Sequence, residues 1–205
     1  MARTTKEQAQ KTREKLIETA IDVFYERGVN ATTLEQVAEA AGLTRGAFYW
    51  HFKNKLDLVS AVHEHFHLHI LGTLQEELES TSTPPLERVR NTWRKFLHGI
   101  ATNQMYRKVI TIFMLKCDYS GELAGLLEQQ LARKDEARAM VAANFQEALD
   151  KNHIKPAYTA QQLMQAHMCY MHGILYEHIA HNKVERLKED GDRLIDFYFS
   201  CLPVN

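Results

Sequence analysis

Two short helical patterns separated by a glycine, within residues 32–55, constrain most strongly what this chain can fold into. Apolar residues around Val37 recur at the spacing of one helical face, and Gly42 follows where a helix end needs a positive φ. Phe48 and Phe52 place two rings on one face of a second helix. The pattern predicts a helix-turn-helix, whose second helix enters the major groove of DNA.

Threonines can begin both of these helices. Thr32 with Glu35, or Thr33 with Gln36, has the spacing of a capping box, and the sequence leaves the choice between them open. Thr44 can cap the second helix.

The residues that face away from the two rings have the chemistry of a DNA-binding surface. No acidic residue occurs between Glu39 and Asp57. An arginine at a helix N-terminus can reach guanine O6 and N7, a glycine allows close approach of the backbone, and hydroxyl, imidazole and ammonium groups suit phosphate oxygens. The predicted DNA-binding residues are Thr33, Thr44, Arg45, Gly46, Tyr49, Trp50, His51 and Lys55.

The run GLTRGAFYWHFKNKLDL, residues 42–58, resembles the signature of the TetR family of bacterial regulators, G-[VL]-[ST]-x-[GA]-x-[LIF]-Y-x-H-F-x-x-K-x-x-L. Every fixed position of that signature is matched. The segment TRGAFYWHFKNK is most similar to the multidrug efflux repressors of the AcrR, TtgR and MtrR type. KCDY at 116–119 and MHGILYEHI at 171–179 extend the similarity beyond the DNA-binding part.

The resemblance implies an all-α protein of about nine helices, and the scarcity of helix breakers, four prolines and nine glycines, independently favours helices. It implies a DNA-binding domain over 1–54 and a ligand-binding and dimerisation domain over 55–205. The implied function is a ligand-responsive repressor that binds a palindromic operator as a homodimer and leaves it when an inducer binds. An activator, or a regulator of another pathway, fits the same sequence.

Charge and cysteine content agree with this interpretation. Residues 1–55 carry nine Lys and Arg against seven Asp and Glu, whereas the remainder carries an excess of acidic residues. Three widely spaced cysteines form neither a disulfide framework nor a zinc-finger spacing. No signal peptide or apolar run of ~20 residues is apparent, so we expect a cytoplasmic protein associated with the bacterial nucleoid and no membrane partner.

Aromatic and methionine side chains recur on the predicted inner faces of the helices between residues 55 and 181. Rings offer stacking and cation–π surface, and methionines adapt to varied shapes. Together with the resemblance to efflux repressors, they predict a pocket for aromatic or amphiphilic compounds, cationic ones among them, although each residue also suits an ordinary core. The predicted ligand-binding residues are Phe66, His67, Ile70, Trp93, Phe96, Ile110, Phe113, Met114, Val141, Met168, Met171 and His172.

The two apolar helices expected over 160–181 and 184–202 are the family's dimerisation helices. The alternative is that they close the subunit's own core. The predicted interface residues are Ile174, His178, Leu194, Phe197, Tyr198 and Cys201.

An enzyme is the alternative from a different class. His63, Glu64 and His67 formally match the H-E-x-x-H motif of zinc hydrolases. Such a site also needs a third ligand and an open cleft, and no third ligand stands at a fixed spacing. We therefore predict no metal, no cofactor and no catalytic residues.

Overall fold

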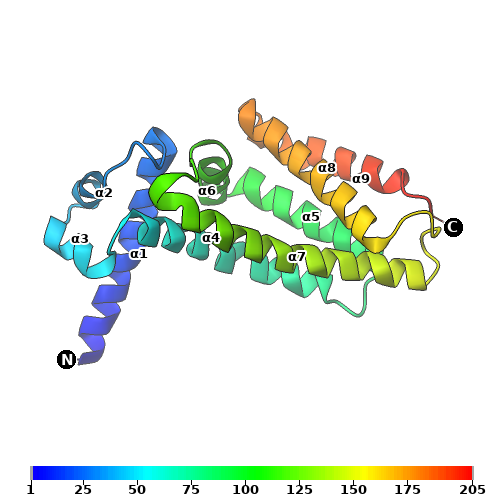
Figure 1. The fold of residues 1–205 in the computed structure, drawn as a ribbon, viewed down its shortest axis with the longest axis horizontal. Helices are drawn as coiled ribbons and strands as arrows, with labels where there is room; N and C mark the ends of the chain where they lie inside the picture. Colours follow the sequence, from blue (N-terminus) through cyan, green and yellow to red (C-terminus); the bar gives the residue numbers. More distant parts are fainter. Residues whose placement is uncertain (1, 205) are drawn as a thin grey trace. The chain divides into compact units, whose positions relative to one another are not determined.

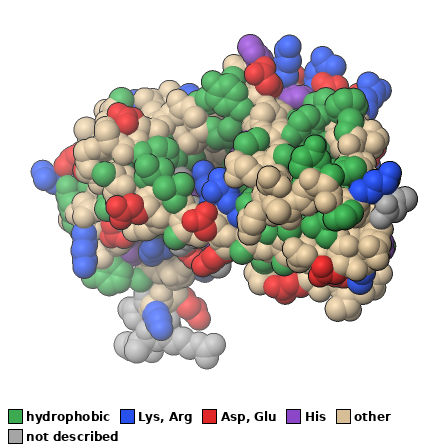
Figure 2. Space-filling view, turned by 45° about the vertical axis from the view of Figure 1, so that its right-hand side comes forward, with side chains coloured by type: hydrophobic (Ala, Val, Ile, Leu, Met, Phe, Trp, Pro, Cys, Tyr) green, Lys and Arg blue, Asp and Glu red, His purple; other side chains and the backbone are tan. Residues whose placement is uncertain are grey.

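The computed structural model describes residues 2–204, except for the side chains of residues 2–5, 68–73, 130 and 133. The described chain is α-helical, as predicted, apart from an isolated bridge between Ile154 and Val204. On the face shown in Figure 2, groups of hydrophobic side chains lie between Lys, Arg, Asp and Glu side chains. Within residues 2–204, none of the helices combines the length and the apolar character that crossing a membrane requires. The helices of Figure 1 are α1 (Ala2–Arg27), α2 (Leu34–Ala40), α3 (Arg45–His51), α4 (Lys55–Leu78), α5 (Pro85–Thr102), α6 (Gln104–Leu115), α7 (Ala124–Asp150), α8 (Ala160–Ala180) and α9 (Leu187–Ser200), with 3-10 turns η1 (Gly121–Leu123) and η2 (Val184–Arg186).

Packing divides the chain into two compact units. The first comprises Met1–Leu68 and Met105–Gln129, and the second comprises His69–Gln104 and Gln130–Asn205. The helices α4 and α7 therefore contribute residues to both units. The predicted domain boundary between residues 54 and 55 marks the end of the DNA-binding sequence, and it stays a prediction. The packing units differ from it because α1 and the two short helices α2 and α3 need the start of α4 and all but the first residue of α6 to complete their core.

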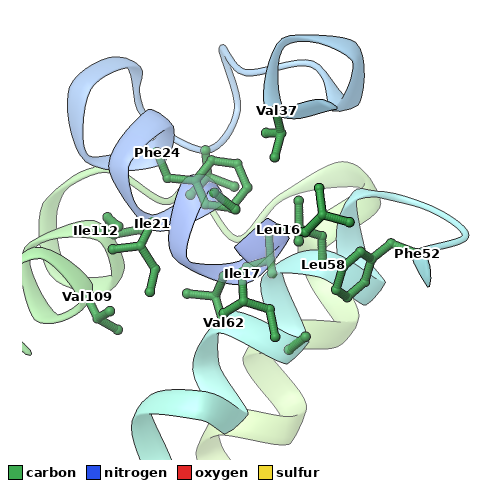
Figure 3. Packing of buried hydrophobic residues seen from close by; sticks show 14 of the residues in the cluster. Leu16, Ile17, Ile21, Phe24, Val37, Phe52, Leu58, Val62, Val109 and Ile112 are labelled. Atoms are coloured by element: carbon green, nitrogen blue, oxygen red, sulfur yellow. The ribbon is translucent and has the colours of Figure 1, made fainter. Parts of the chain in front are cut away.

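The first unit is built around α1. Its buried face meets α2 and α3 on one side, and the first half of α4 and α6 on the other (Figure 3). Helices of seven residues, such as α2 and α3, bury too little surface to be stable alone. The surrounding helices supply that burial, with core residues that include Leu16, Ile17, Ile21, Phe24, Val37, Phe52, Leu58, Val62, Val109 and Ile112.

Hydrogen bonds at the helix ends settle the alternatives that the sequence left open. Thr33 forms the capping box with Gln36, while the Thr32 hydroxyl donates to the Gly28 carbonyl at 2.8 Å. Thr44 caps α3 by accepting the Ala47 N–H. The turn between α2 and α3 is held by Gly42 at φ +68°, a conformation that costs other L-residues free energy.

The segment between α6 and η1 docks on the turn that follows α1. The Val29 N–H donates to the Lys116 carbonyl at 2.9 Å. The Asn30 side chain exchanges two hydrogen bonds with the backbone of Asp118, at 3.1 and 2.9 Å. The Lys116 ammonium donates to the Tyr25 carbonyl and lies 4.8 Å from the Tyr25 ring centroid. These contacts fix one end of α6 against the helices that carry the helix-turn-helix.

In the second unit, α5 packs along α9. A methyl group at Gly191 would come within 2.9 Å of Leu97 Cδ1, so the glycine permits close approach of the two helices. His98 Nε2 lies 3.1 Å from the carboxylate of Asp192 across the same contact. α8 begins with a second capping box, from Thr159.

His167 of α8 lies at the centre of this unit with both ring nitrogens buried and without hydrogen-bond partners. Four aromatic rings have centroids within 5.9 Å of its own, those of Trp93, Phe145, Tyr198 and Phe199. Burial in these apolar surroundings lowers the pKa of His167 to about 3, with a smaller contribution from His172. The imidazole is therefore neutral in the folded protein at physiological pH.

Because the unfolded chain protonates this histidine near pH 6.5 and the folded chain does not, acid should selectively destabilise the fold. Replacement His167→Leu removes that penalty. When the pH falls from 7 to 5, the free energy of unfolding of the native chain should decrease by about 2 kcal/mol more than that of the variant. Urea denaturation at both pH values measures the gap. For His153→Leu, at an exposed position, the difference in unfolding free energy between variant and native chain should be the same at both pH values. If that difference is also the same at both pH values for His167→Leu, the buried ring accepts a proton and the prediction is wrong.

Candidate nucleic-acid interface

The two phenylalanines of the α3 region decide which way this helix faces. Phe48 and Phe52 are fully buried, with ring centroids 5.7 Å apart. The Arg13 guanidinium of α1 lies 5.0 Å from the centroid of the Phe52 ring. With the two rings anchored in the core of the first unit, the opposite face of α3 is exposed, as the helical periodicity predicts.

That exposed face presents Arg45, Gly46, Tyr49 and Trp50. Arg45 and Trp50 project furthest into solvent, because the Arg45 side chain and the Trp50 residue are each 72% exposed. A Cβ atom added at Gly46 would have no neighbour within 4 Å, so the backbone there is open to an approaching molecule. The exposed rings of Tyr49 and Trp50 are therefore available for contact with another molecule.

Arg45 is oriented before any DNA arrives. Its guanidinium lies 5.4 Å from the Tyr49 ring centroid, and its Nε is 3.3 Å from a Glu35 carboxylate oxygen. Both members of this ion pair are well exposed, so the pair contributes little free energy. A guanine edge can therefore displace Glu35 without a large penalty, while the ring still supports the guanidinium.

The predicted phosphate-binding side chains Thr33 and Thr44 are both exposed, and each hydroxyl oxygen accepts a backbone N–H at 3.2 Å. Each hydroxyl proton remains available for donation to a phosphate. His51 is half-buried beside Trp50, and burial, followed by the charge of Arg13, lowers its pKa. A neutral His51 can donate one N–H.

Lys55 has a different environment from the others. Its side chain is only 14% exposed, and its ammonium lies 3.1 Å from the Glu122 carboxylate of η1 and 3.3 Å from the Asn30 carbonyl. In this conformation the ammonium bridges the start of α4 to the docked α6–η1 segment. Its contact with a DNA phosphate stays a prediction, and it requires Glu122 to be displaced.

The predicted ligand-binding residues are distributed over the two units, and the side chain of Ile70 lies outside the described residues. In the first unit, Phe66 packs edge-on against Tyr106, with centroids 5.9 Å apart. In the second unit, Trp93 contacts the rings of Phe96 and His172. Buried side chains among the remainder are Val141, Met168 and Met171, while His67, Ile110, Phe113 and Met114 are half-buried.

Sequence reasoning missed His167, which completes the ring cluster around Trp93. The available signal was position: His167 shares one helical face with Met164 and Met171, three and four residues away, and that face is buried.

The predicted dimer residues separate into two groups. Ile174 and His178 are buried within the second unit, and His178 Nδ1 lies 2.7 Å from the Ile174 carbonyl oxygen. Their place in a subunit interface stays a prediction, and this structure assigns both side chains to the subunit's own core. Phe197 and Cys201 are exposed, and Leu194 and Tyr198 are half-buried. Phe197 is therefore the best placed of the six for contact with a second subunit.

The H-E-x-x-H residues lie on α4. The rings of His63 and His67 stack with centroids 6.3 Å apart, and His63 also packs edge-on against Phe113. Among the side chains that the structure describes, no group of three or more His, Cys, Asp or Glu lies close enough to hold a metal ion.

Residues 16–62 match the model of the family described as bacterial regulatory proteins, tetR family. The HTH-type transcriptional regulator TtgR of Pseudomonas putida is 31% identical over 180 residues, 85% of this chain and 83% of that protein. The regulator AcrR of Shigella flexneri is 38% identical over 131 residues, 63% of this chain and 60% of that protein.

Two solved structures share the whole fold. NalD, the secondary repressor of the MexAB-OprM multidrug efflux pump in Pseudomonas aeruginosa, has a TM-score of 0.85 at 26% identity, covering 96% of this chain and 97% of that one. A SmeT–triclosan complex has a TM-score of 0.82 at 28% identity, covering 95% and 92%. The match to TtgR over most of both chains, together with the family-model match across the helix-turn-helix, shows that this protein is a DNA-binding transcriptional regulator of the TetR family.

Proposed function

We propose that the protein represses a multidrug efflux operon in the bacterial cytoplasm and leaves its operator when a small aromatic or amphiphilic compound binds. The observation that carries the DNA-binding part is the capped, core-anchored α3, which presents Arg45, Tyr49 and Trp50 to solvent. The efflux part is supported by the similarity to NalD, described as an efflux-pump repressor. Ligand response is supported by the similarity to SmeT, whose structure contains triclosan.

A homodimer and a palindromic operator belong to the same proposal. A single short recognition helix contacts few base pairs, and a two-fold dimer places two such helices about 34–36 Å apart, one turn of DNA. Phe197, 60% exposed on α9, supports an interface through the last two helices, because a large apolar side chain in water favours burial against a partner.

The docked α6–η1 segment offers a physical route for the response. It holds Asn30 and Lys55 beside the helix-turn-helix, and α7 begins directly after η1. A ligand that prefers another arrangement of α7 would displace η1 and change the position of Lys55. It would reduce DNA affinity only by the difference in its affinities for the two states.

The whole proposal is tested by selecting an operator from random DNA and then screening dyes, bile salts, antibiotics and plant phenolics by thermal shift. Compounds that stabilise the protein should release the selected operator. Stabilising compounds that leave operator affinity unchanged would refute ligand-driven release. Transcription in vitro from a promoter with this operator should fall when the protein is added, whereas an increase would identify an activator.

Arg45→Ala should relax the preference at one base pair of each half-site by about 1–3 kcal/mol, because the bidentate contact is lost. Binding to the selected operator and to its single-base variants measures this. Lys53→Ala, an exposed cation just beyond α3, should instead weaken all sequences equally and reduce the salt slope by about one. An unchanged base preference for Arg45→Ala would contradict the base-reading role.

Glu122→Gln should raise affinity for any DNA sequence and steepen its salt dependence, because the ammonium of Lys55 becomes available to a phosphate. Glu18→Gln, which removes an exposed carboxylate of the same unit, provides the matched control for net charge. Equal affinities for the two variants across a salt titration would show that Lys55 has a structural role only.

Phe197→Glu should yield monomers in light scattering, because it places a charge at the centre of the proposed interface. Tyr158→Glu alters another exposed ring of the same unit and should leave the dimer intact. Because Ile174 is buried in the subunit, a charge there would test folding rather than assembly. A dimer that persists in Phe197→Glu rules against this interface.

A further inference from the structure

Glu35 of α2 is an acidic residue on the surface that carries the candidate DNA-binding side chains. One of its carboxylate oxygens lies 3.3 Å from the Nε of Arg45, and the side chains of Glu35 and Arg45 are 50% and 72% exposed. Glu35 is absent from the DNA-binding residues predicted from the sequence. The contact nevertheless places its carboxylate beside the guanidinium that is proposed to read guanine.

The packing of two helices brings these two side chains together. α2 begins at a capping box and buries Ala38, whose carbonyl accepts the Leu43 N–H at 2.9 Å across the turn. α3 is anchored by Phe48 in the same core. Because the buried faces of both helices are fixed, the position of Glu35 beside Arg45 depends on the helix-turn-helix itself rather than on a loop.

The ion pair leaves much of the hydrogen-bonding capacity of both groups unused. A guanidinium has N–H donors on all of its nitrogens, and each carboxylate oxygen can accept more than one hydrogen bond. In the part of the chain that the structure describes, the polar contact between the two side chains joins the Nε of Arg45 to one oxygen of Glu35. Both Nη atoms and the second carboxylate oxygen therefore remain available to a base pair.

A carboxylate has few partners on DNA. Phosphate oxygens are negatively charged acceptors and repel it, so its partners in the major groove are the amino groups of cytosine and adenine. An arginine that binds guanine O6 and N7 has the paired cytosine directly beside it, because the cytosine N4 amino group is hydrogen-bonded to that O6. The amino group nearest to such an arginine therefore belongs to cytosine.

We propose that Glu35 is a second base-reading residue, which accepts a hydrogen bond from the N4 amino group of the cytosine paired with the guanine that Arg45 reads. This inference rests on the base-reading role of Arg45 in the proposed function and extends it to α2. An A·T pair in the same orientation places the adenine N6 donor before Arg45 and the thymine O4 acceptor before Glu35. The two side chains together therefore reject that pair at both of its bases.

Modified bases test each contact on the selected operator without breaking Watson–Crick pairs. N4-methylcytosine replaces the N–H that faces the major groove, and 7-deazaguanine removes the N7 acceptor. Methylation of one cytosine in each half-site should weaken binding of the native chain about tenfold, because a hydrogen bond to a charged group is lost. The guanine paired with that cytosine should be the one at which the deaza substitution weakens binding of the native chain but not that of Arg45→Ala.

The variant Glu35→Ala should bind the methylated and unmethylated operators equally. Glu35→Met keeps most of the length of the side chain without an acceptor and should behave in the same way. Glu39→Ala is the matched control, since it removes the same charge from an exposed position one turn further along α2 and should retain the tenfold loss. Thermal denaturation checks that each variant is folded.

Two outcomes overturn the proposal. The first needs no variant: methylation of each cytosine in turn leaves the affinity of the native chain unchanged. The second is a loss on methylation that persists in Glu35→Ala or Glu35→Met, which would mean that the methyl group is excluded by its size and not by the missing donor.

The same measurements separate this inference from the function on which it rests. If a guanine depends on Arg45 and no cytosine depends on Glu35, the inference is wrong and base reading by Arg45 stands. If a cytosine depends on Glu35 while Arg45→Ala leaves every base preference unchanged, Glu35 reads the operator and the proposed role of Arg45 fails.

Discussion

The burial of Phe48 and Phe52 against α1 is the interaction on which the rest of the first unit depends. Two buried aromatic side chains contribute roughly 3–6 kcal/mol of hydrophobic free energy, which a seven-residue helix cannot obtain by itself. Because the two rings lie on one side of the helix, their burial also determines its rotation. Arg45 and Trp50 are exposed as a direct consequence, so the same packing both stabilises the helix-turn-helix and aims its reading surface.

The docked α6–η1 segment connects this surface to the rest of the first unit. Asn30 pairs with the backbone of Asp118, and Lys55 joins that turn to Glu122. Short polar contacts of this kind are specific in geometry but moderate in energy, since each net hydrogen bond contributes about 1 kcal/mol. A connection with these properties can be remade by a modest change in free energy, which suits the proposed release of DNA on ligand binding.

The second unit shows the opposite arrangement: polar groups enclosed without partners. His167 is surrounded by aromatic rings, and within the described residues both of its ring nitrogens lack hydrogen-bond partners. An apolar residue at position 167 would avoid the cost of burying an imidazole whose two nitrogens have no hydrogen-bond partner within the described residues.

The sequence by itself determined the helical class, the helix-turn-helix, the cap at Thr44 and the left-handed turn at Gly42, because each depends on residues within a few positions of one another. Only the tertiary structure decided which threonine completes the first capping box, since Thr32 is diverted to the Gly28 carbonyl. It also decided that Lys55 binds Glu122 and that Ile174 is buried. These relations join residues far apart in the chain or depend on which face of a helix is covered, and spacing along a sequence does not contain that information.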